Sequence, residues 1–158
     1  MKKNYPKKSL GQNFLIDQNI IDIIINSGDI KKNDTILEVG PGTGNLTKKI
    51  LSKNPKKMFA VEMDKFLSKK LHEKFKEKII LINDDILKID EKKYSNDPLV
   101  VFGNLPYNIS TQILVKWIRC INLKNTFKKF ILMFQKEVAD RILAETNSKN
   151  YGRLAVLS

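Results

Sequence analysis

The stretch Leu99-Val100-Val101-Phe102-Gly103-Asn104-Leu105-Pro106-Tyr107 joins an apolar run to a turn with polar and aromatic groups. A short run of this composition indicates a strand that is buried on both faces. The turn therefore follows the carboxyl end of a strand, where open α/β sheets hold their ligands. An amide oxygen and a ring at this spacing can hold the amino group of a planar base and stack on its face. The alternative is an ordinary strand-ending turn, with an Asn cap and a buried Tyr107.

Similar apolar runs occur along the whole chain and alternate with segments of helical periodicity. The five predicted strands lie at residues 35–39, 58–61, 79–82, 99–102 and 130–134. Strands that alternate with helices are typical of a parallel sheet with right-handed crossovers. We therefore predict an α/β fold with a Rossmann-like, doubly wound, mostly parallel sheet.

The helical segments carry apolar residues on one face. We predict helices over residues 17–27, around 46–51, and over 64–75 and 110–121. Their ends are expected at Gly28, which stops the first, at Asp64, which caps the third, and at Ser110 or Thr111, which caps the fourth. The buried face of the third is expected to consist of Phe66, Leu67, Leu71 and Phe75.

The composition limits the class of protein. With 158 residues, of which 42% are hydrophobic, the chain is long enough for one domain with its own core. It has no apolar run of the ~20 residues that cross a membrane, and no secretory signal. Its one cysteine, Cys120, excludes an internal disulfide and a cysteine-based metal cluster, so we expect a cytoplasmic protein without a metal site.

The net charge of +12 favours a polyanionic partner. Lysine, asparagine and isoleucine are all abundant, however, so an A/T-rich genome and a solvated lysine surface explain the charge equally well. Charge alone leaves both explanations open.

A glycine-rich turn follows the first predicted strand, Glu38-Val39-Gly40-Pro41-Gly42-Thr43-Gly44. Glycine lets a ligand approach the main chain closely. Glu62 ends the second strand, where an acid can accept hydrogen bonds from ribose hydroxyls. Asp84 and Asp85 end the third, and either carboxylate can take the amino group of an adenine. Three successive strand ends thus predict a site for a cofactor that contains adenosine.

Two cofactor classes compete for this site. A dinucleotide requires G-x-G-x-x-G, whose third glycine would fall where the chain has Asn45. The glycines fall instead at positions 40, 42 and 44. The pattern E-x-G-x-G-x-G suits S-adenosylmethionine, which has no pyrophosphate to bind at a helix N-terminus. We therefore predict S-adenosylmethionine as the cofactor.

These motifs resemble those of the rRNA adenine N(6),N(6)-dimethyltransferases, which comprise the small-subunit rRNA dimethylases and the erythromycin-resistance methylases. The resemblance covers the family's capping motif, glycine loop, catalytic loop and two later signatures, at residues 8–15, 38–44, 102–110, 135–139 and 151–154. Leu105 distinguishes the catalytic loop from the D-P-P-Y of DNA adenine methylases. The long form of the loop is more similar to the small-subunit branch than to the resistance branch.

The resemblance implies a class I S-adenosylmethionine-dependent methyltransferase domain over residues 1–158, with a capping segment over about 1–28. Its implied reaction is dimethylation of the exocyclic amines of adjacent adenines in a loop near the 3′ end of 16S rRNA, linked to ribosome biogenesis. The implied cofactor contacts are Asn13, Leu15, Gly40, Glu62, Asp85 and Asn104. We expect a monomer that binds the rRNA of the small subunit or of its assembly intermediate, and no membrane.

The family also carries a small helical C-terminal domain that helps to grip rRNA. Residues 153–158 form an apolar run with no stop signal after it. We therefore expect the chain to be truncated before the last strands of the sheet and before that domain.

Asn104, Leu105 and Tyr107 are the predicted catalytic residues. The Asn104 side-chain oxygen and the Leu105 backbone carbonyl would accept both N–H bonds of the amine and orient its lone pair toward the methyl group. Tyr107 would stack on a base that has left its helix. Phe134 would either cover the opposite side of that base or pack in the core.

Three other functions remain open from the sequence. The first is a 23S rRNA adenine methylase of the resistance type, and the second is a DNA adenine methylase. The third is an rRNA-binding assembly factor without enzymatic activity on the same fold. The acids and the amide at positions 62, 85 and 104 favour an enzyme over this last alternative.

Overall fold

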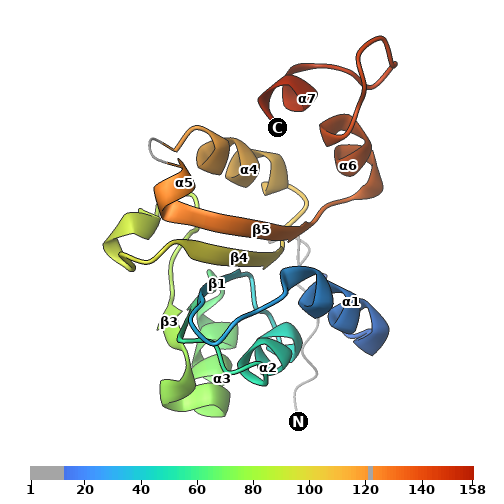
Figure 1. The fold of residues 1–158 in the computed structure, drawn as a ribbon. Helices are drawn as coiled ribbons and strands as arrows, with labels where there is room; N and C mark the ends of the chain where they lie inside the picture. Colours follow the sequence, from blue (N-terminus) through green and yellow to red (C-terminus); the bar gives the residue numbers. More distant parts are fainter. Residues whose placement is uncertain (1–12, 121–122) are drawn as a thin grey trace.

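The computed structural model describes residues 13–120 and 123–158. Within them, five parallel strands form one sheet in the order β3-β2-β1-β4-β5 (Figure 1). Their bounds are β1 Thr35–Val39, β2 Lys57–Val61, β3 Ile80–Ile82, β4 Leu99–Asn104 and β5 Phe127–Met133. The strand order reverses at β1, which lies between β2 and β4, so the predicted doubly wound parallel sheet is confirmed.

Helices cover both faces of this sheet. They are α1 Gln18–Gly28, α2 Asn45–Leu51, α3 Lys65–Phe75, α4 Ser110–Ile118, α5 Leu123–Thr126, α6 Lys136–Ile142 and α7 Arg153–Leu157, with 3-10 turns η2 Lys76–Lys78 and η3 Glu91–Lys93. Side chains of α1, α2 and α3 pack with Ile36 and Phe102 in one core. Side chains of α4 pack with Leu37 and Val101 in the other. Figure 1 shows α4 on the opposite side of the strands from α1, α2 and α3.

Strand β5 begins three residues before its predicted start at residue 130. Lys128 and Lys129 interrupt the apolar pattern there, although both lie within the strand. The Lys128 Nζ reaches Asp34 at 2.6 Å and the Lys129 Nζ reaches the Gly28 carbonyl at 3.2 Å. These distant partners tie the start of β5 to the rest of the domain, and the local pattern does not reveal them.

The predicted stop of α1 at Gly28 is confirmed, although Gly28 does not itself take the left-handed conformation. It is the last helical residue, and Asp29 takes the left-handed conformation instead, with φ 47°. Gly28 is required for packing, since a Cβ there would lie 2.4 Å from the Phe102 ring. At the start of α3, the Asp64 carboxylate accepts the N–H groups of Phe66 and Leu67, so the predicted cap is confirmed.

Two details of the later helices were predicted wrongly. Neither Ser110 nor Thr111 caps α4: Ile109 occupies the capping position without a side-chain bond, and the helix ends at Ile118. Phe66 is 51% exposed rather than buried, and the Lys70 Nζ lies 4.5 Å from the centre of its ring. Helical spacing alone assigned Phe66 to the buried face, whereas α3 turns only one side toward the sheet.

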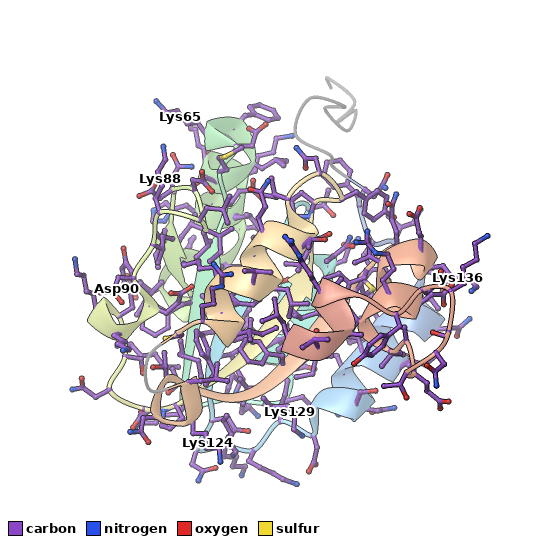
Figure 2. The ribbon with its side chains drawn as sticks, turned by 90° about the horizontal axis from the view of Figure 1, so that it is seen from above. Lys65, Lys88, Asp90, Lys124, Lys129 and Lys136 are labelled. Carbon is purple, nitrogen blue, oxygen red and sulfur yellow. The ribbon has the colours of Figure 1, made fainter. Side chains whose placement is uncertain are left out.

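Lysines occur on more than one side of the molecule. Figure 2, which views the molecule from above, shows Lys65 of α3, Lys124 of α5 and Lys136 of α6 on different sides. These three lysines therefore do not gather on one face of the molecule.

Candidate active site

The glycine turn after β1 forms a cradle at the carboxyl end of the sheet. Gly42 has φ +58°, and a Cβ on it would approach the Phe14 ring to 3.0 Å. Gly44 has φ +78°, and a Cβ there would lie 2.5 Å from the Phe75 ring of α3. Gly42 thus keeps the backbone open beside Phe14, whereas Gly44 lets α2 begin close to α3.

Glu62 follows β2 and faces this turn. One carboxylate oxygen accepts the Gly42 N–H at 3.2 Å and the other accepts the Asp64 N–H at 2.9 Å. Its side chain is almost fully buried, and burial raises the pKa of Glu62 against the lowering effect of these N–H groups. A carboxylate has about four lone-pair sites, so capacity remains for a ligand hydroxyl. Glu62 therefore holds the glycine turn and can bind a ribose as well.

Asn104 is the last residue of β4. Its amide nitrogen Nδ2 donates to the Asn13 carbonyl at 2.6 Å. A carbonyl only accepts hydrogen bonds, so this contact assigns the NH₂ group to the Asn13 side and leaves Oδ1 on the other. The contact also joins the capping segment to the strand end across 91 residues of sequence.

A cleft with a volume of about 160 Å³ lies among these groups. That volume is several times the ~30 Å³ of a water molecule, so the cleft has room for part of an organic ligand. Its walls come from the ends of β1, β2, β3 and β4 and from the capping segment. They are lined by Asn13, Phe14, Val39, Gly40, Gly42, Val61, Glu62, Met63, Asp84, Asp85, Ile86, Leu87, Asn104, Pro106, Asn108 and Ile109.

Five of the six predicted cofactor contacts line this one cleft, namely Asn13, Gly40, Glu62, Asp85 and Asn104. The sixth, Leu15, lines a smaller adjoining cavity, where its carbonyl accepts the Asn45 side chain at 2.9 Å. Asp84 lines the cleft beside Asp85, so both carboxylates can reach a ligand there. Residues 8–12 of the capping motif lie outside the described residues.

The predicted catalytic residues other than Asn104 lie beside the cleft. The Leu105 side chain is buried in the core between α4 and the sheet, which we call the α4 core. Only its backbone can therefore serve the reaction. Tyr107 is 41% exposed, which leaves its ring accessible to a base. Phe134 is half-buried and packs against the α4 core, as the core alternative requires.

Sequence reasoning gave Glu38 no role, although the residue belongs to the glycine motif. Its side chain is buried, and the Thr47 hydroxyl donates to its Oε2 at 2.6 Å. Burial raises the pKa of Glu38 to about 7, despite the opposing effect of Thr47. Glu38 lines the adjoining cavity. An acid inside an otherwise apolar strand was the signal that could have revealed it.

Two other features are absent from the described residues. No group of three or more His, Cys, Asp or Glu side chains in them has the geometry to hold a metal ion. No described helix is both long and apolar enough to cross a membrane.

Residues 3–158 match the profile of the family described as "Ribosomal RNA adenine dimethylase". The chain belongs to this family. "Ribosomal RNA small subunit methyltransferase A" of Pelagibacter ubique is 57% identical over 152 residues, which cover 96% of this chain and 58% of the relative. The protein of the same name from Ehrlichia ruminantium is 45% identical over 164 residues, which cover 100% of this chain and 62% of the relative. The chain thus spans about three fifths of the length of these relatives.

Solved structures of the family show the same architecture. A dimethyladenosine transferase from Plasmodium falciparum aligns with a TM-score of 0.80 at 32% identity, over 92% of this chain and 51% of that one. The 23S rRNA methyltransferase ErmE aligns with a TM-score of 0.72 at 26% identity, over 89% and 53%. The chain therefore has the class I S-adenosylmethionine-dependent methyltransferase fold, as the resemblance implied.

Proposed function

We propose that this protein transfers methyl groups from S-adenosylmethionine to the exocyclic nitrogen of adenines in small-subunit rRNA. The observation that carries the proposal is the orientation of Asn104. Its Nδ2 is held by the Asn13 carbonyl, so its Oδ1 points to the other side and can accept a hydrogen bond from an N–H group at the edge of the cleft. Family membership supports the same reaction.

The hydrogen-bond acceptors of the cleft fit this cofactor. Glu62 offers oxygens for the ribose hydroxyls, and Asp85 offers a carboxylate for the adenine amino group. Val61, Ile86 and Leu87 add apolar surface for a purine. Among the described residues that line the cleft, acids occur but no lysine or arginine does. Such a lining suits a cationic sulfonium better than the pyrophosphate of a dinucleotide.

When bound, S-adenosylmethionine supplies a methyl group on a good leaving group. The residues of this chain prepare the nucleophile. Asn104 Oδ1 and the Leu105 carbonyl accept hydrogen bonds from the two N–H groups of the amine. These bonds favour a pyramidal nitrogen whose lone pair is available for attack. Asparagine stays neutral, so the proton leaves the nitrogen only after attack. One N–H bond remains after the first transfer, and the same acceptor can therefore hold the amine for a second.

Tyr107 is the proposed contact for the face of the target adenine. Its exposed ring stands three residues after Asn104, and Pro106 between them lines the cleft. Stacking of a base on such a ring contributes about 1–3 kcal/mol. This contact would hold an adenine that has left its helix while Asn104 binds its amine.

The proposed substrate is the pair of adjacent adenines near the 3′ end of 16S rRNA. The relatives at 57% and 45% identity carry a small-subunit name, whereas ErmE, a 23S rRNA methyltransferase, is 26% identical. We further propose that residues 1–158 form the methyltransferase domain, that residues 13–15 help to enclose the cofactor, and that the protein acts as a cytoplasmic monomer.

The test uses the protein at its full natural length. It is incubated with S-adenosylmethionine and, in separate reactions, with unmethylated small ribosomal particles, 23S rRNA or duplex DNA. Mass spectrometry of the digested nucleosides should find dimethyladenosine from the small particles alone. Dimethyladenosine from 23S rRNA would favour the resistance-type alternative, and methyladenine in DNA would favour a DNA methylase.

A separate measurement tests the non-enzymatic alternative. Isothermal calorimetry with S-adenosylmethionine should reveal one site per chain. A pure assembly factor need not take up the cofactor, so the absence of binding heat at millimolar ligand would contradict the proposal.

A further inference from the structure

Lys116 of α4 donates hydrogen bonds to three acceptors in the segment that follows β3. Its Nζ lies 2.7 Å from the Ile86 carbonyl, 2.5 Å from the Ile89 carbonyl and 2.8 Å from a Glu91 carboxylate oxygen. An ammonium group has three donors, so all of them have a partner in this segment. The Lys116 side chain is 23% exposed, which distinguishes it from the solvated lysines of the surface.

The neighbouring residue strengthens the same attachment. Trp117 is buried, and its indole N–H donates to the same Glu91 oxygen at 2.7 Å. The Glu91 carboxylate is itself almost fully buried, so it needs hydrogen-bond partners such as these two donors. Lys116, Trp117 and Glu91 therefore form a clamp between α4 and the segment that follows β3.

This clamp connects two parts of the cleft lining. Residues 84–87 form one wall, and Ile86, whose carbonyl Lys116 holds, belongs to it. Asn104, Pro106, Asn108 and Ile109 form another part of the lining, and α4 begins immediately after them. Lys116 itself does not line the cleft. It fixes the distance between a wall for the cofactor and a wall for the substrate amine.

Residues 84–90 have little regular structure of their own between β3 and η3. Backbone carbonyls in such a segment need donors from elsewhere when water is excluded. Without Lys116, the carbonyls of Ile86 and Ile89 would lose this donor, and Glu91 would keep only the indole. The expected response is a shift of the segment, which carries Asp84 and Asp85 with it.

We propose that Lys116 is a positioning residue, which sets the wall formed by residues 84–87 for the adenosine part of the cofactor. The inference rests on the proposed function, because that function assigns the adenine to this wall. It predicts that cofactor affinity depends on a side chain that never touches the cofactor. It also predicts that the loss concerns the adenosine half of the ligand and not its amino-acid half.

The test compares Lys116→Met with the matched variant Lys128→Met. Lys128 also binds an almost fully buried carboxylate, that of Asp34, but at the opposite end of the sheet. Calorimetry measures binding of S-adenosylhomocysteine and of 5′-methylthioadenosine, which lacks the amino-acid half. Lys116→Met should raise both dissociation constants by about tenfold, the size by which supporting residues tune a site. Lys128→Met should change either by less than about twofold, and melting temperatures are measured for both.

An equal fold-increase in the dissociation constants of both ligands supports the proposal. Wild-type affinity in Lys116→Met would overturn it, and so would a loss no larger than that of Lys128→Met at the same fall in melting temperature. If Lys116→Met fails to fold, Lys116→Arg decides. Arginine keeps several donors, so a smaller loss with a near-native melting temperature supports the clamp, and unchanged affinity for both ligands overturns it. Failure of the wild-type protein to bind either ligand would instead refute the proposed function, and with it the inference.

Discussion

The two ends of the parallel sheet differ in whether lysines pair with their carboxylates. At the amino end, Lys128 lies 2.6 Å from Asp34 and Lys56 lies 2.7 Å from Asp97. At the carboxyl end, Glu38 and Glu62 are buried, and no lysine or arginine of the described residues forms an ion pair with either. Their hydrogen bonds come from a hydroxyl and from backbone N–H groups.

The direction of the pKa shifts follows this difference. Burial acts to raise the pKa of Asp34, but Lys128 and the Lys31 N–H outweigh it and the pKa falls. Lys56 and the Thr35 hydroxyl lower the pKa of Asp97. Burial raises the pKa of both Glu38 and Glu62. A buried carboxylate that is ionised without a cation nearby lowers the stability of the fold. A cationic or hydroxyl-bearing ligand at the carboxyl end can offset this loss.

The largest expected effect comes from removing the proposed hydrogen-bond acceptor for the amine at the carboxyl end. Asn104→Ala should lower kcat for rRNA methylation by about 10²–10³-fold, the usual cost of losing one aimed dipole. The melting temperature should change little, because Asn104 is only half-buried. Single-turnover kinetics measures the loss, and Asn19→Ala on α1 serves as the control. Near-native turnover in Asn104→Ala would refute its catalytic role.

The second prediction concerns the pH dependence that Glu38 imposes. Its pKa is about 7 in the folded protein and 4.5 in the reference state. The folded state therefore binds the proton more tightly, and stability is fully present below pH 4.5 and declines as pH rises through 7. The difference corresponds to a free energy on the order of 3 kcal/mol.

Glu38→Gln stays neutral at every pH and still offers an oxygen to Thr47. Urea denaturation at pH 5 and pH 7.5 should find a flatter profile for this variant than for the wild type. The exposed Glu73→Gln is the control and should leave the wild-type slope in place. Parallel profiles for Glu38→Gln and wild type would mean that Glu38 is not the group responsible.

The sequence predicted those parts of the molecule that local chemistry determines. Buried strands appeared as apolar runs, and the Asp64 cap followed from its position before a helical segment. The strand-end acids were found because parallel strands end at one edge. The buried position of Phe66 and the start of β5 were predicted wrongly, since each depends on a partner or a surface that lies elsewhere in the fold.

The site shows the same division. Cleft residues such as Gly40 and Glu62 belong to motifs with a fixed spacing. The bond between Asn104 and Asn13 spans 91 residues, and that between Lys116 and Ile86 spans 30. No local pattern specifies such contacts, because they depend on how the strands are ordered in the sheet.

The third prediction tests the amino end. Asp34→Asn removes a charge that accepts hydrogen bonds from Lys128 and from the Lys31 N–H. The expected loss is about 1 kcal/mol of unfolding free energy at pH 7, because Lys128 is half-exposed and solvent weakens its pairing. The lowered pKa means that the wild-type advantage is present above pH 3.8 and is lost as pH falls below it. Affinity for S-adenosylhomocysteine should stay unchanged, and a tenfold loss would contradict the separation of the two ends.

The smallest expected effect belongs to Phe66, an exposed ring near the carboxyl end. If this end is arranged for a ligand more than for stability, truncating an exposed apolar group there should cost little. Phe66→Ala loses one contact with Lys70, worth about 0.5 kcal/mol at an exposed site, and gains helix propensity in return. The neighbouring Leu67 is 4% exposed, so Leu67→Ala should cost about 2–4 kcal/mol. Urea denaturation of both variants separates the two sides of α3, and a loss above ~1.5 kcal/mol in Phe66→Ala would mean that its ring is packed in solution.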